Sequence, residues 1–337
     1  METAKAISDL RLEIGDWRFI FRAGVWKPRT SPHTFQGVGA PALEWLKEVK
    51  DTFGMEIATE VASPEHVEAA LRAGVDYLWI GARSSANPIV VQSICSAIED
   101  WRWKIGDLKG VMIKNPVNQD ADLWLGNIER IERAVKGLQV TGDGIPVMAV
   151  HRGCGHKPCW GMAHKVRLAR PDIPMLLDPS HMSGDAAKVP ELMGKIAELG
   201  LDGAMIEVHA NPEQALSDKA QQIKPECLPE IIPFGGDGHD SERVLSPQGK
   251  ESTELNWLRA EIDELDEQLW DTIAARMDVS KRIGEWKKAH GVAPLQPERV
   301  KVIGERLKVT GERLHLSEDF IQKMWDIIHE ESLKQQK

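Results

Sequence analysis

The sequence is poor in cysteine, has a single tyrosine, and contains no long apolar run. Four cysteines in 337 residues do not make a disulfide framework, so a hydrophobic core must hold the fold together. No apolar segment approaches the roughly 20 residues that a membrane-spanning helix needs. Residues 1–17 also lack the uninterrupted apolar centre of a signal peptide. We therefore expect a cytoplasmic protein with no membrane partner.

Positive charge is also in deficit. The chain has 42 Lys and Arg against 52 Asp and Glu, a net charge of -10, which argues against nonspecific binding to nucleic acid. Any anionic ligand must then be held by a local cluster of cations. The hydrophobic content of 42% and the charged content of 28% are ordinary for a soluble protein with one large core, or one large and one small.

Residues 17–232 alternate between short β-rich runs and amphipathic helical stretches. The β-rich runs begin at Trp17, Met55, Val75, Gly110, Val147, Ile173 and Leu201. Helical periodicity appears at 41–54, 63–74, 88–101, 123–138 and 186–200, whereas 154–171 is typical of a loop. Near-continuous apolar strands alternating with helices predict a parallel sheet covered by helices. At this length a (β/α)8 barrel is the leading candidate, although only seven strands can be counted.

Ionisable side chains collect where these runs end. They are Arg22, Lys27, Arg29, Glu60, Arg83, Lys114, His151, Arg152, Asp178, His181, Glu207 and His209. In a barrel the C-terminal ends of all strands meet at one mouth, where ligands bind. Three cations fall within RAGVWKPRT alone, which favours a doubly anionic substrate. For any one of these side chains, a structural ion pair or a basic surface loop is the alternative interpretation.

Seven strings, RAGVWKPRTSPHTFQG, GARSSANP, VMIKNPVN, VHRG, LLDPSHMSG, MIEVHANP and ALSDKAQQ, carry a family resemblance. In order and spacing they resemble the strand-end motifs of type I 3-deoxy-D-arabino-heptulosonate 7-phosphate (DAHP) synthase, β subtype, from about residue 5 to residue 232. The resemblance implies a TIM-type barrel that condenses phosphoenolpyruvate with erythrose 4-phosphate, the first step of the shikimate pathway. A sibling barrel synthase using another phosphosugar is an alternative that the KPRTSP string disfavours.

The resemblance implies a substrate contact for each matching cation. Arg83 and Arg152 would bind the phosphate of phosphoenolpyruvate, because a guanidinium pairs well with that dianion. Lys114 would bind its carboxylate, together with Arg22. The pair Arg29–Thr30 would receive the phosphate of erythrose 4-phosphate.

The resemblance also implies the residues that carry out the chemistry. Lys27 would be the general acid near the aldehyde oxygen, where negative charge develops. Glu60 would accept a proton from a water or orient it. His181, Glu207 and Asp218 match the ligands of a divalent metal, Mn2+ or a similar ion, acting as a Lewis acid on the aldehyde.

One motif of that family is missing. Its first strand ends in Gly-Pro-Cys-Ser, whose cysteine is the fourth metal ligand, and no such strand precedes the helical residues 1–10. We therefore expect a barrel that is either short of its first strand, as truncation would leave it, or closed by a segment from elsewhere. Without the cysteine, metal affinity should be low and condensation slow. The alternative is an inactive barrel that serves as a scaffold. Cys154 and Cys159, with His151 and His156 nearby, do not have zinc-site spacing.

The amino-acid composition changes after Pro233. Residues 234–254 are polar and rich in Gly and Ser, which indicates a linker. From Leu255 apolar residues recur every three or four positions until Gly291, which predicts a long helix. Two shorter helices should follow, one from Glu298 and one capped by Ser317. One long helix with two short ones does not form a good globular core by itself, so we expect it to pair with a second copy as a homodimer.

Residues 255–337 resemble the all-helical class of chorismate mutase. The matching residues are Arg259, Arg276, Lys287, Arg299, Ser332 and Gln336. The resemblance implies a cofactor-free rearrangement of chorismate to prephenate. In it, Lys287 and Gln336 would donate hydrogen bonds to the ether oxygen, while Arg259 and Arg276 would bind the carboxylates. Val300 departs from the glutamate that many members carry there.

Helical geometry separates these arginines. Arg259 precedes Arg276 by seventeen residues, about 25 Å at ~1.5 Å per residue, so we expect Arg259 to serve the site of a partner subunit. A solvated coiled-coil face is the alternative for these cations. Both resemblances together predict a bifunctional enzyme whose synthase activity prephenate lowers. A chain acting only as a mutase or a prephenate sensor is the second hypothesis.

Overall fold

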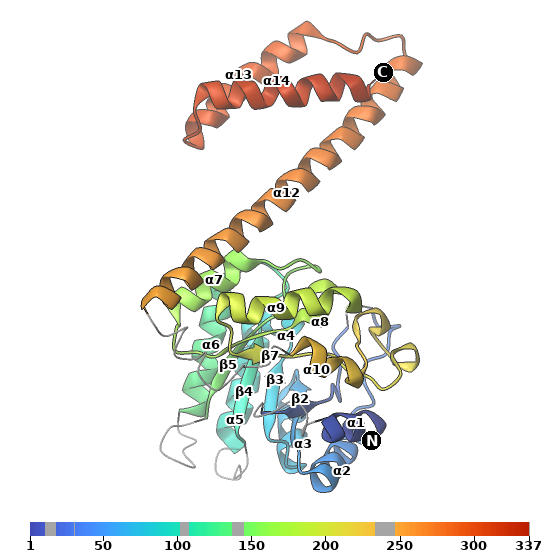
Figure 1. Ribbon diagram of the computed structural model, residues 1–337, viewed down its shortest axis with the longest axis vertical. Coiled ribbons are helices and arrows are strands. Elements are labelled where there is room, and N and C mark those ends of the chain that lie inside the picture. The colour runs from blue at the N-terminus through green and yellow to red at the C-terminus, as the bar shows by residue number, and fades with distance from the viewer. Residues whose placement is uncertain (11–17, 30, 102–107, 137–144, 233–246, 337) are drawn as a thin grey trace. The chain divides into compact units, whose positions relative to one another are not determined.

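The computed structural model describes residues 1–10, 18–29, 31–101, 108–136, 145–232 and 247–336. Within them the chain forms two compact units, Met1–Glu261 and Ile262–Lys337. The first unit contains a parallel sheet with helices, and the second is helical (Figure 1).

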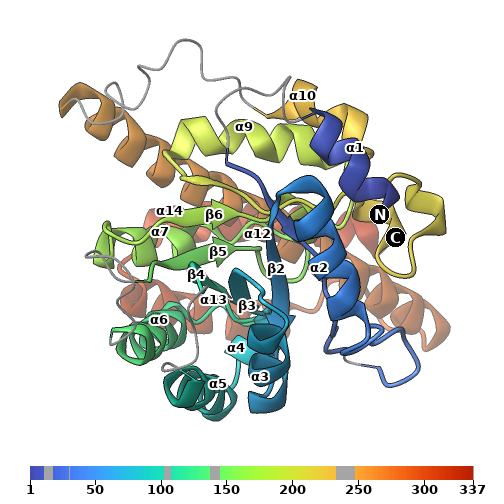
Figure 2. The ribbon, with the colours of Figure 1, turned by 90° about the horizontal axis from the view of Figure 1, so that it is seen from below.

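One parallel sheet organises the first unit, and its strands are neighbours in sequence order (Figure 2). They are β1 (Ile20–Arg22), β2 (Glu56–Val61), β3 (Tyr77–Ile80), β4 (Gly110–Lys114), β5 (Val147–His151), β6 (Met175–Leu177) and β7 (Gly203–Ala204). All seven predicted strands are thus confirmed. Within the described ranges β1 and β7 form the two edges of the sheet, which is a half-barrel and is not closed.

Helices between the strands cover the outside of the sheet (Figure 2). The longer ones are α2 (Ala42–Phe53), α3 (Pro64–Arg72), α5 (Pro88–Trp101), α6 (Ala121–Val135), α7 (Trp160–Ala169) and α9 (Val189–Leu199). Short helices are α1 (Glu2–Leu10), α4 (Ala82–Ser85), α8 (Pro179–Ser183) and α10 (Leu228–Ile231), with single turns η1 (Ala186–Lys188), η2 (Pro212–Gln214), η3 (Lys219–Gln221) and η4 (Pro225–Cys227). Ser63 caps α3, since its hydroxyl accepts a hydrogen bond from the His66 amide at 3.4 Å.

Helix α7 corrects one prediction, because the segment 154–171 was expected to be a loop. Its side chains Trp160, Met162, Ala163, His164 and Val166 are all buried. A helix that buries several of its sides has no single apolar stripe, and its sequence therefore lacks helical periodicity.

Two apolar clusters lie on the two faces of the sheet. On β3, Tyr77 and Trp79 belong to the inner cluster, whereas Leu78 and Ile80 pack into the larger core beneath the helices. Alternate residues of a strand point to opposite faces, so this pattern fixes which side chain at each strand end can reach the mouth of the sheet.

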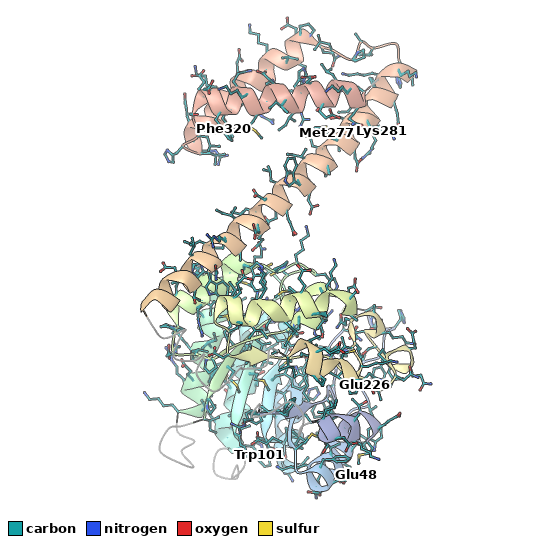
Figure 3. The ribbon with its side chains drawn as sticks, viewed as in Figure 1. Glu48, Trp101, Glu226, Met277, Lys281 and Phe320 are labelled. Atoms are coloured by element: carbon teal, nitrogen blue, oxygen red, sulfur yellow. The ribbon has the colours of Figure 1, made fainter. Side chains whose placement is uncertain are left out.

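The second unit consists of helices, as predicted. Its elements are the greater part of α12 (Pro247–Ala289), α13 (Pro297–Arg313) and α14 (Glu318–Gln335). Ser317 caps α14 by accepting a hydrogen bond from the amide of Phe320, labelled in Figure 3. Helix α12 begins at Pro247, earlier than the predicted Leu255, so the end of the expected linker is helical. Residues 234–246 lie outside the described residues.

The first turns of α12 pack as part of the first unit. Trp257 and Ala260 are buried there, and the Trp257 indole Nε1 donates a hydrogen bond to the Leu199 carbonyl at 3.0 Å. The indole also stacks on the His164 ring, with centroids 5.4 Å apart. Among the helices that the structure describes, none is long and apolar enough to cross a membrane.

Candidate functional site

A cavity of 410 Å³ opens at the C-terminal ends of the strands. It is lined by seven of the residues that the sequence placed at strand ends: Arg22, Lys27, Glu60, Lys114, His181, Glu207 and His209. They come from β1, β2, β4 and α8 and from the segments after β1 and β7. The predicted convergence on one mouth is therefore present in this half-barrel.

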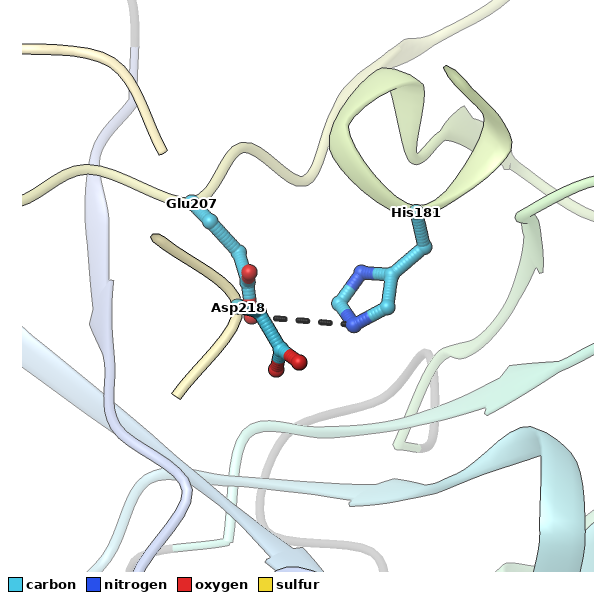
Figure 4. A group of neighbouring side chains, drawn as sticks. All are labelled: His181, Glu207 and Asp218. Atoms are coloured by element: carbon cyan, nitrogen blue, oxygen red, sulfur yellow. Dashed lines mark ion pairs between the residues drawn. The ribbon is translucent and has the colours of Figure 1, made fainter. Parts of the chain in front are cut away.

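His181, Glu207 and Asp218 lie together beside this cavity (Figure 4). Each offers one ligand atom, and these atoms all lie within 4.8 Å of one another. His181 Nε2 is 3.6 Å from Glu207 Oε1. Atoms at such separations can share an ion about 2.0 to 2.3 Å from each. No cysteine belongs to this group within the described residues.

Hydrogen bonds and cations fix the Glu207 carboxylate. Its Oε2 accepts a hydrogen bond from the Gln221 amide at 2.7 Å, and its Oε1 lies 3.1 Å from the Arg22 guanidinium. Burial opposes ionisation, but His181 and Arg22 outweigh burial and hold the pKa of Glu207 below its ordinary value. Glu207 is therefore an anion, as a metal ligand must be.

Two cations from the loop after β1 hold Asp218. The Lys27 ammonium contacts its Oδ2, and Arg29 Nη1 lies 3.1 Å from its Oδ1. Lys27 also donates a hydrogen bond to the Ser217 hydroxyl at 2.7 Å. Burial opposes ionisation of Asp218, yet Lys27 and Arg29 lower its pKa to about 2. Thr30, predicted to act with Arg29, lies outside the described residues.

A buried carboxylate, Asp178, joins Lys114 to His181. Its Oδ2 accepts a hydrogen bond from Lys114 Nζ at 2.6 Å, and its Oδ1 lies 3.0 Å from His181 Nδ1. Burial opposes ionisation of Asp178, but His181 and Lys114 hold its pKa well below the ordinary value. Sequence reasoning placed Asp178 at a strand end without giving it a role. The sequence did contain a signal for its contact with His181, because in LLDPSH Asp178 precedes that histidine by three residues.

Arg152 and Arg83 border the site without lining the cavity that the structure describes. The Arg152 amide donates a hydrogen bond to Asn115 Oδ1 at 2.7 Å, and Asn115 Nδ2 donates to the Gly153 carbonyl at 3.1 Å. Arg83 lies on α4, directly after β3. Asn115 is fully buried and was missed, although it follows Lys114 in the KNP string.

Glu60 faces the cavity where β3 ends. A Cβ added to Gly81 would lie 1.9 Å from Glu60 Oε1, so only glycine leaves room for this carboxylate. Burial raises the pKa of Glu60, with Lys114 and Arg22 opposing that shift. Glu60 is therefore suited to exchange a proton with a water in the cavity.

Four of the six residues predicted for the helical domain contact one another in two pairs. Lys287 Nζ donates hydrogen bonds to Gln336 Oε1 at 3.0 Å and to the Pro294 carbonyl at 2.5 Å. Arg276 donates to the Ser332 hydroxyl, and burial lowers the pKa of its guanidinium. Gly284 permits this packing, because a Cβ there would lie 2.5 Å from Gln336 Cα.

Arg259 and Arg299 lie apart from these pairs in the chain. Arg299 is exposed on α13. Arg259 is exposed on the part of α12 that belongs to the first unit. Its expected role in the site of another subunit stays a prediction.

Comparisons with known proteins divide the chain in the same place. Residues 1–240 match the DAHP synthetase I family, and residues 258–337 match chorismate mutase type II. A crystal structure of a DAHP synthase from Thermotoga maritima is similar to the chain with a TM-score of 0.56 at 26% identity, covering 72% of this chain and 65% of that one.

Three curated relatives match different parts of the chain. The phospho-2-dehydro-3-deoxyheptonate aldolase of Thermotoga maritima is 29% identical over 245 residues, which are 69% of this chain and 63% of the relative. A 2-dehydro-3-deoxyphosphooctonate aldolase of Helicobacter pylori is 27% identical over 64% of this chain and 81% of its own length. The 4-amino-4-deoxychorismate mutase of Streptomyces venezuelae is 40% identical over 78 residues, 23% of this chain and 76% of that protein.

The chain thus spans less than two thirds of the Thermotoga aldolase. Because one family matches 240 of the 337 residues and a second matches the helical remainder, this chain belongs to the DAHP synthetase I family and carries a C-terminal chorismate mutase type II domain.

Proposed function

We propose that the first unit condenses phosphoenolpyruvate with erythrose 4-phosphate and that the helical domain converts chorismate to prephenate. The observation that carries the first activity is the meeting of three metal-ligand side chains with Arg22, Lys27 and Lys114 at one cavity. Cations beside anionic ligand groups suit a reaction between two phosphorylated substrates on a divalent ion. Both reactions use small polar metabolites, and we place the protein in the cytoplasm.

The donor set fits a divalent metal. One imidazole nitrogen and two ionised carboxylates are ligands that Mn2+ and similar ions accept. When bound, such an ion supplies Lewis-acid polarisation of the aldehyde. The protein's own groups then bind and orient: Lys114 and Arg22 hold the carboxylate of phosphoenolpyruvate, and Arg83 and Arg152 hold its phosphate.

Proton transfer falls to two residues of the cavity. Lys27, fixed by Ser217 and Asp218, donates to the aldehyde oxygen as negative charge develops there. Glu60, whose pKa is raised by burial, accepts a proton from a water molecule or orients that water. Arg29 receives the phosphate of the sugar.

The helical domain needs no cofactor for its reaction. Lys287 and Gln336 donate to the ether oxygen, while Arg276, Arg299 and Ser332 bind the carboxylate and hydroxyl groups of the substrate. Arg259 completes the site from a second copy of the chain. Exposed apolar residues on α12, among them Ile262 and Leu265, support this dimer, because a second copy would cover them.

The synthase proposal is tested by incubating the whole chain with Mn2+, phosphoenolpyruvate and erythrose 4-phosphate and measuring the seven-carbon product. His181→Ala should lose at least about 100-fold in rate through the loss of a ligand. As a matched control, His315→Ala changes an exposed histidine of the second unit and should leave the rate unchanged. Product formation from arabinose 5-phosphate instead would assign the chain to the sibling synthases.

The mutase proposal has a control in the next residue. Lys287 is buried against Gln336, whereas Lys288 is exposed. Lys287→Ala should lower the rate of chorismate consumption about 100-fold or more, and Lys288→Ala should leave it unchanged. Mutase activity without any condensation would favour the inactive barrel, and equal rates in both variants would remove Lys287 from the mechanism.

A further inference from the structure

Asp178 is the buried carboxylate on which the site is built. It follows β6 and caps α8, and its amide donates a hydrogen bond to the His151 carbonyl of β5 at 2.8 Å. Its two oxygens face Lys114 of β4 and His181 of α8. One fully buried residue therefore contacts β5 through its backbone and both β4 and α8 through its side chain.

The contacts of Asp178 determine the tautomer of His181. An ionised carboxylate can only accept hydrogen bonds, and its oxygens lie 3.0 and 2.9 Å from His181 Nδ1. Nδ1 must then carry the ring proton. The lone pair of the ring is left on Nε2, which is the nitrogen 3.6 Å from Glu207 Oε1.

Asp178 also fixes where that ring lies. Its Oδ1 accepts the His181 backbone amide at 3.1 Å, and its carbonyl accepts the Met182 amide at 3.1 Å. The first turn of α8 is thereby tied to the same residue that orients the imidazole. Little freedom remains for the ring to turn Nε2 away from Glu207.

The same carboxylate holds Lys114. Its Oδ2 is 2.6 Å from Lys114 Nζ, and both side chains are removed from water. A buried ammonium keeps one direction only when a fixed anion holds it. Lys114 lines the cavity, so the position of this cation and the orientation of the His181 ring depend on one group.

We propose that Asp178 is a positioning residue that couples the metal-ligand histidine to the cation holding the carboxylate of the enol phosphate substrate. The inference rests on the proposed function, because it takes His181 as a ligand and Lys114 as a substrate contact. Loss of Asp178 should weaken both kinds of binding, even though the residue touches neither ligand.

The test compares Asp178→Asn with Asp76→Asn in the whole chain. Asp76 is equally buried and also holds a lysine and a backbone amide, with Lys50 Nζ at 3.0 Å and the Ile57 amide at 2.9 Å. It precedes β3, however, and so lies at the opposite end of the sheet from the cavity. It therefore controls for the loss of a buried carboxylate.

The measurements are Mn2+ binding by calorimetry without substrates, phosphoenolpyruvate binding without the sugar, and the tautomer of His181 by nitrogen NMR. Asp178→Asn should weaken Mn2+ binding about 10- to 100-fold, weaken phosphoenolpyruvate binding, and shift the His181 nitrogen signals. Asp76→Asn should leave both affinities within about threefold and the His181 nitrogen signals unshifted, while lowering the melting temperature.

Unchanged Mn2+ affinity in folded Asp178→Asn would overturn the proposal. If that variant does not fold, the NMR spectrum of the unsubstituted chain still tests the proposal. A His181 protonated on Nε2 in that spectrum would contradict the role given to Asp178. None of these readouts requires condensation. A chain that binds Mn2+ through this arrangement but forms no product would refute the proposed function and leave the inference standing.

Discussion

At the scale of single residues, the site is made of cations and anions that position one another. Lys27 and Arg29 contact Asp218, Arg22 contacts Glu207, and Lys114 contacts Asp178. Breaking one partner of such a buried pair leaves an uncompensated charge, which costs more than the pair contributes. Substitutions here are therefore expected to disturb geometry beyond the residue replaced.

Glycine at position 81 gives the sharpest steric prediction. Gly81→Ala places a Cβ 1.9 Å from Glu60 Oε1, so the carboxylate must move away from its place in the cavity. We expect condensation to slow at least tenfold with little change in Mn2+ affinity. Gly194→Ala, a helical position with open space around its Cβ, should leave the rate unchanged and stabilise the fold by about 0.5–1 kcal/mol. Equal rates in both variants would contradict the role of Glu60.

His151 gives a prediction about acid stability. It is fully buried between Trp124 and Trp160, neither ring nitrogen makes a hydrogen bond within the described residues, and burial lowers its pKa to about 3. In the unfolded chain the pKa is about 6.5. The folded state thus binds fewer protons between these values, and its stability falls as the pH drops, by at most about 1.4 kcal/mol per pH unit.

Removing the titrating ring should remove this part of the acid sensitivity. We expect His151→Phe to show a shallower decline of unfolding free energy between pH 6.5 and pH 4 than the unsubstituted chain, as measured by urea unfolding at each pH. Carboxylates contribute equally to both proteins, so the difference isolates His151. Parallel declines would show that the ring does not titrate as burial requires.

The place of a residue in the site could be predicted from the sequence only where its position at the end of a strand determines it. Parallel strands bring their C-terminal ends together, so strand-end cations such as Arg22 and Lys114 could be placed in one cavity. The partners of these groups could not, because a contact such as Lys114 with Asp178 depends on strand register and rotamer. Asn115 and Gly81 were missed for the same reason.

At the scale of elements, periodicity predicted five longer helices of the first unit, α2, α3, α5, α6 and α9. It failed for α7, which buries several of its sides. The beginning of α12 was also placed too late. Polar residues 247–254 carry no apolar stripe, yet the helix extends through them to reach Trp257. Tertiary contacts of Trp257 with α7 and α9, invisible in the sequence pattern, decide where this helix is held.

The docking of Trp257 predicts a stability effect in the first unit. The side chain is 2% exposed, and its indole nitrogen donates to the Leu199 carbonyl. Trp257→Ala should lower the unfolding free energy of the first unit by about 3–5 kcal/mol. Trp257→Phe keeps much of the ring packing and loses the hydrogen bond, so its cost should be clearly smaller. Urea unfolding of the three proteins checks this, and equal stability of all three would show that the contact is marginal.

At the scale of the whole molecule, the exposed apolar residues of α12 predict self-association. Leu265 is 61% and Ile262 is 59% exposed, three residues apart on one helix. We expect the chain to sediment as a dimer and Leu265→Asp to shift it toward monomer with loss of mutase activity, because Arg259 would no longer reach a partner's site. Leu168→Asp, a change at a similarly exposed leucine of α7, should leave the dimer intact.

The fusion of two domains in one chain predicts regulation. Helix α12 is continuous from Trp257, which packs in the first unit, to Lys287, which contacts Gln336 in the second. Under the proposed function, prephenate is the product of the second domain and lies downstream of the product of the first. If prephenate binds one state of the chain better than another, it shifts the balance between them by its difference in affinity.

We therefore expect prephenate to lower the condensation rate of the whole chain, and Lys287→Ala to abolish that inhibition while leaving the uninhibited rate unchanged. By linkage, the substrates of the first domain should weaken prephenate binding by the same factor. The measurement is a prephenate titration of the whole chain, of Lys287→Ala and of a form cleaved near Ser246. Inhibition that is equal in the intact and cleaved forms would show that the covalent connection carries none of the coupling, and no inhibition in either would leave the two domains as independent catalysts joined in one chain.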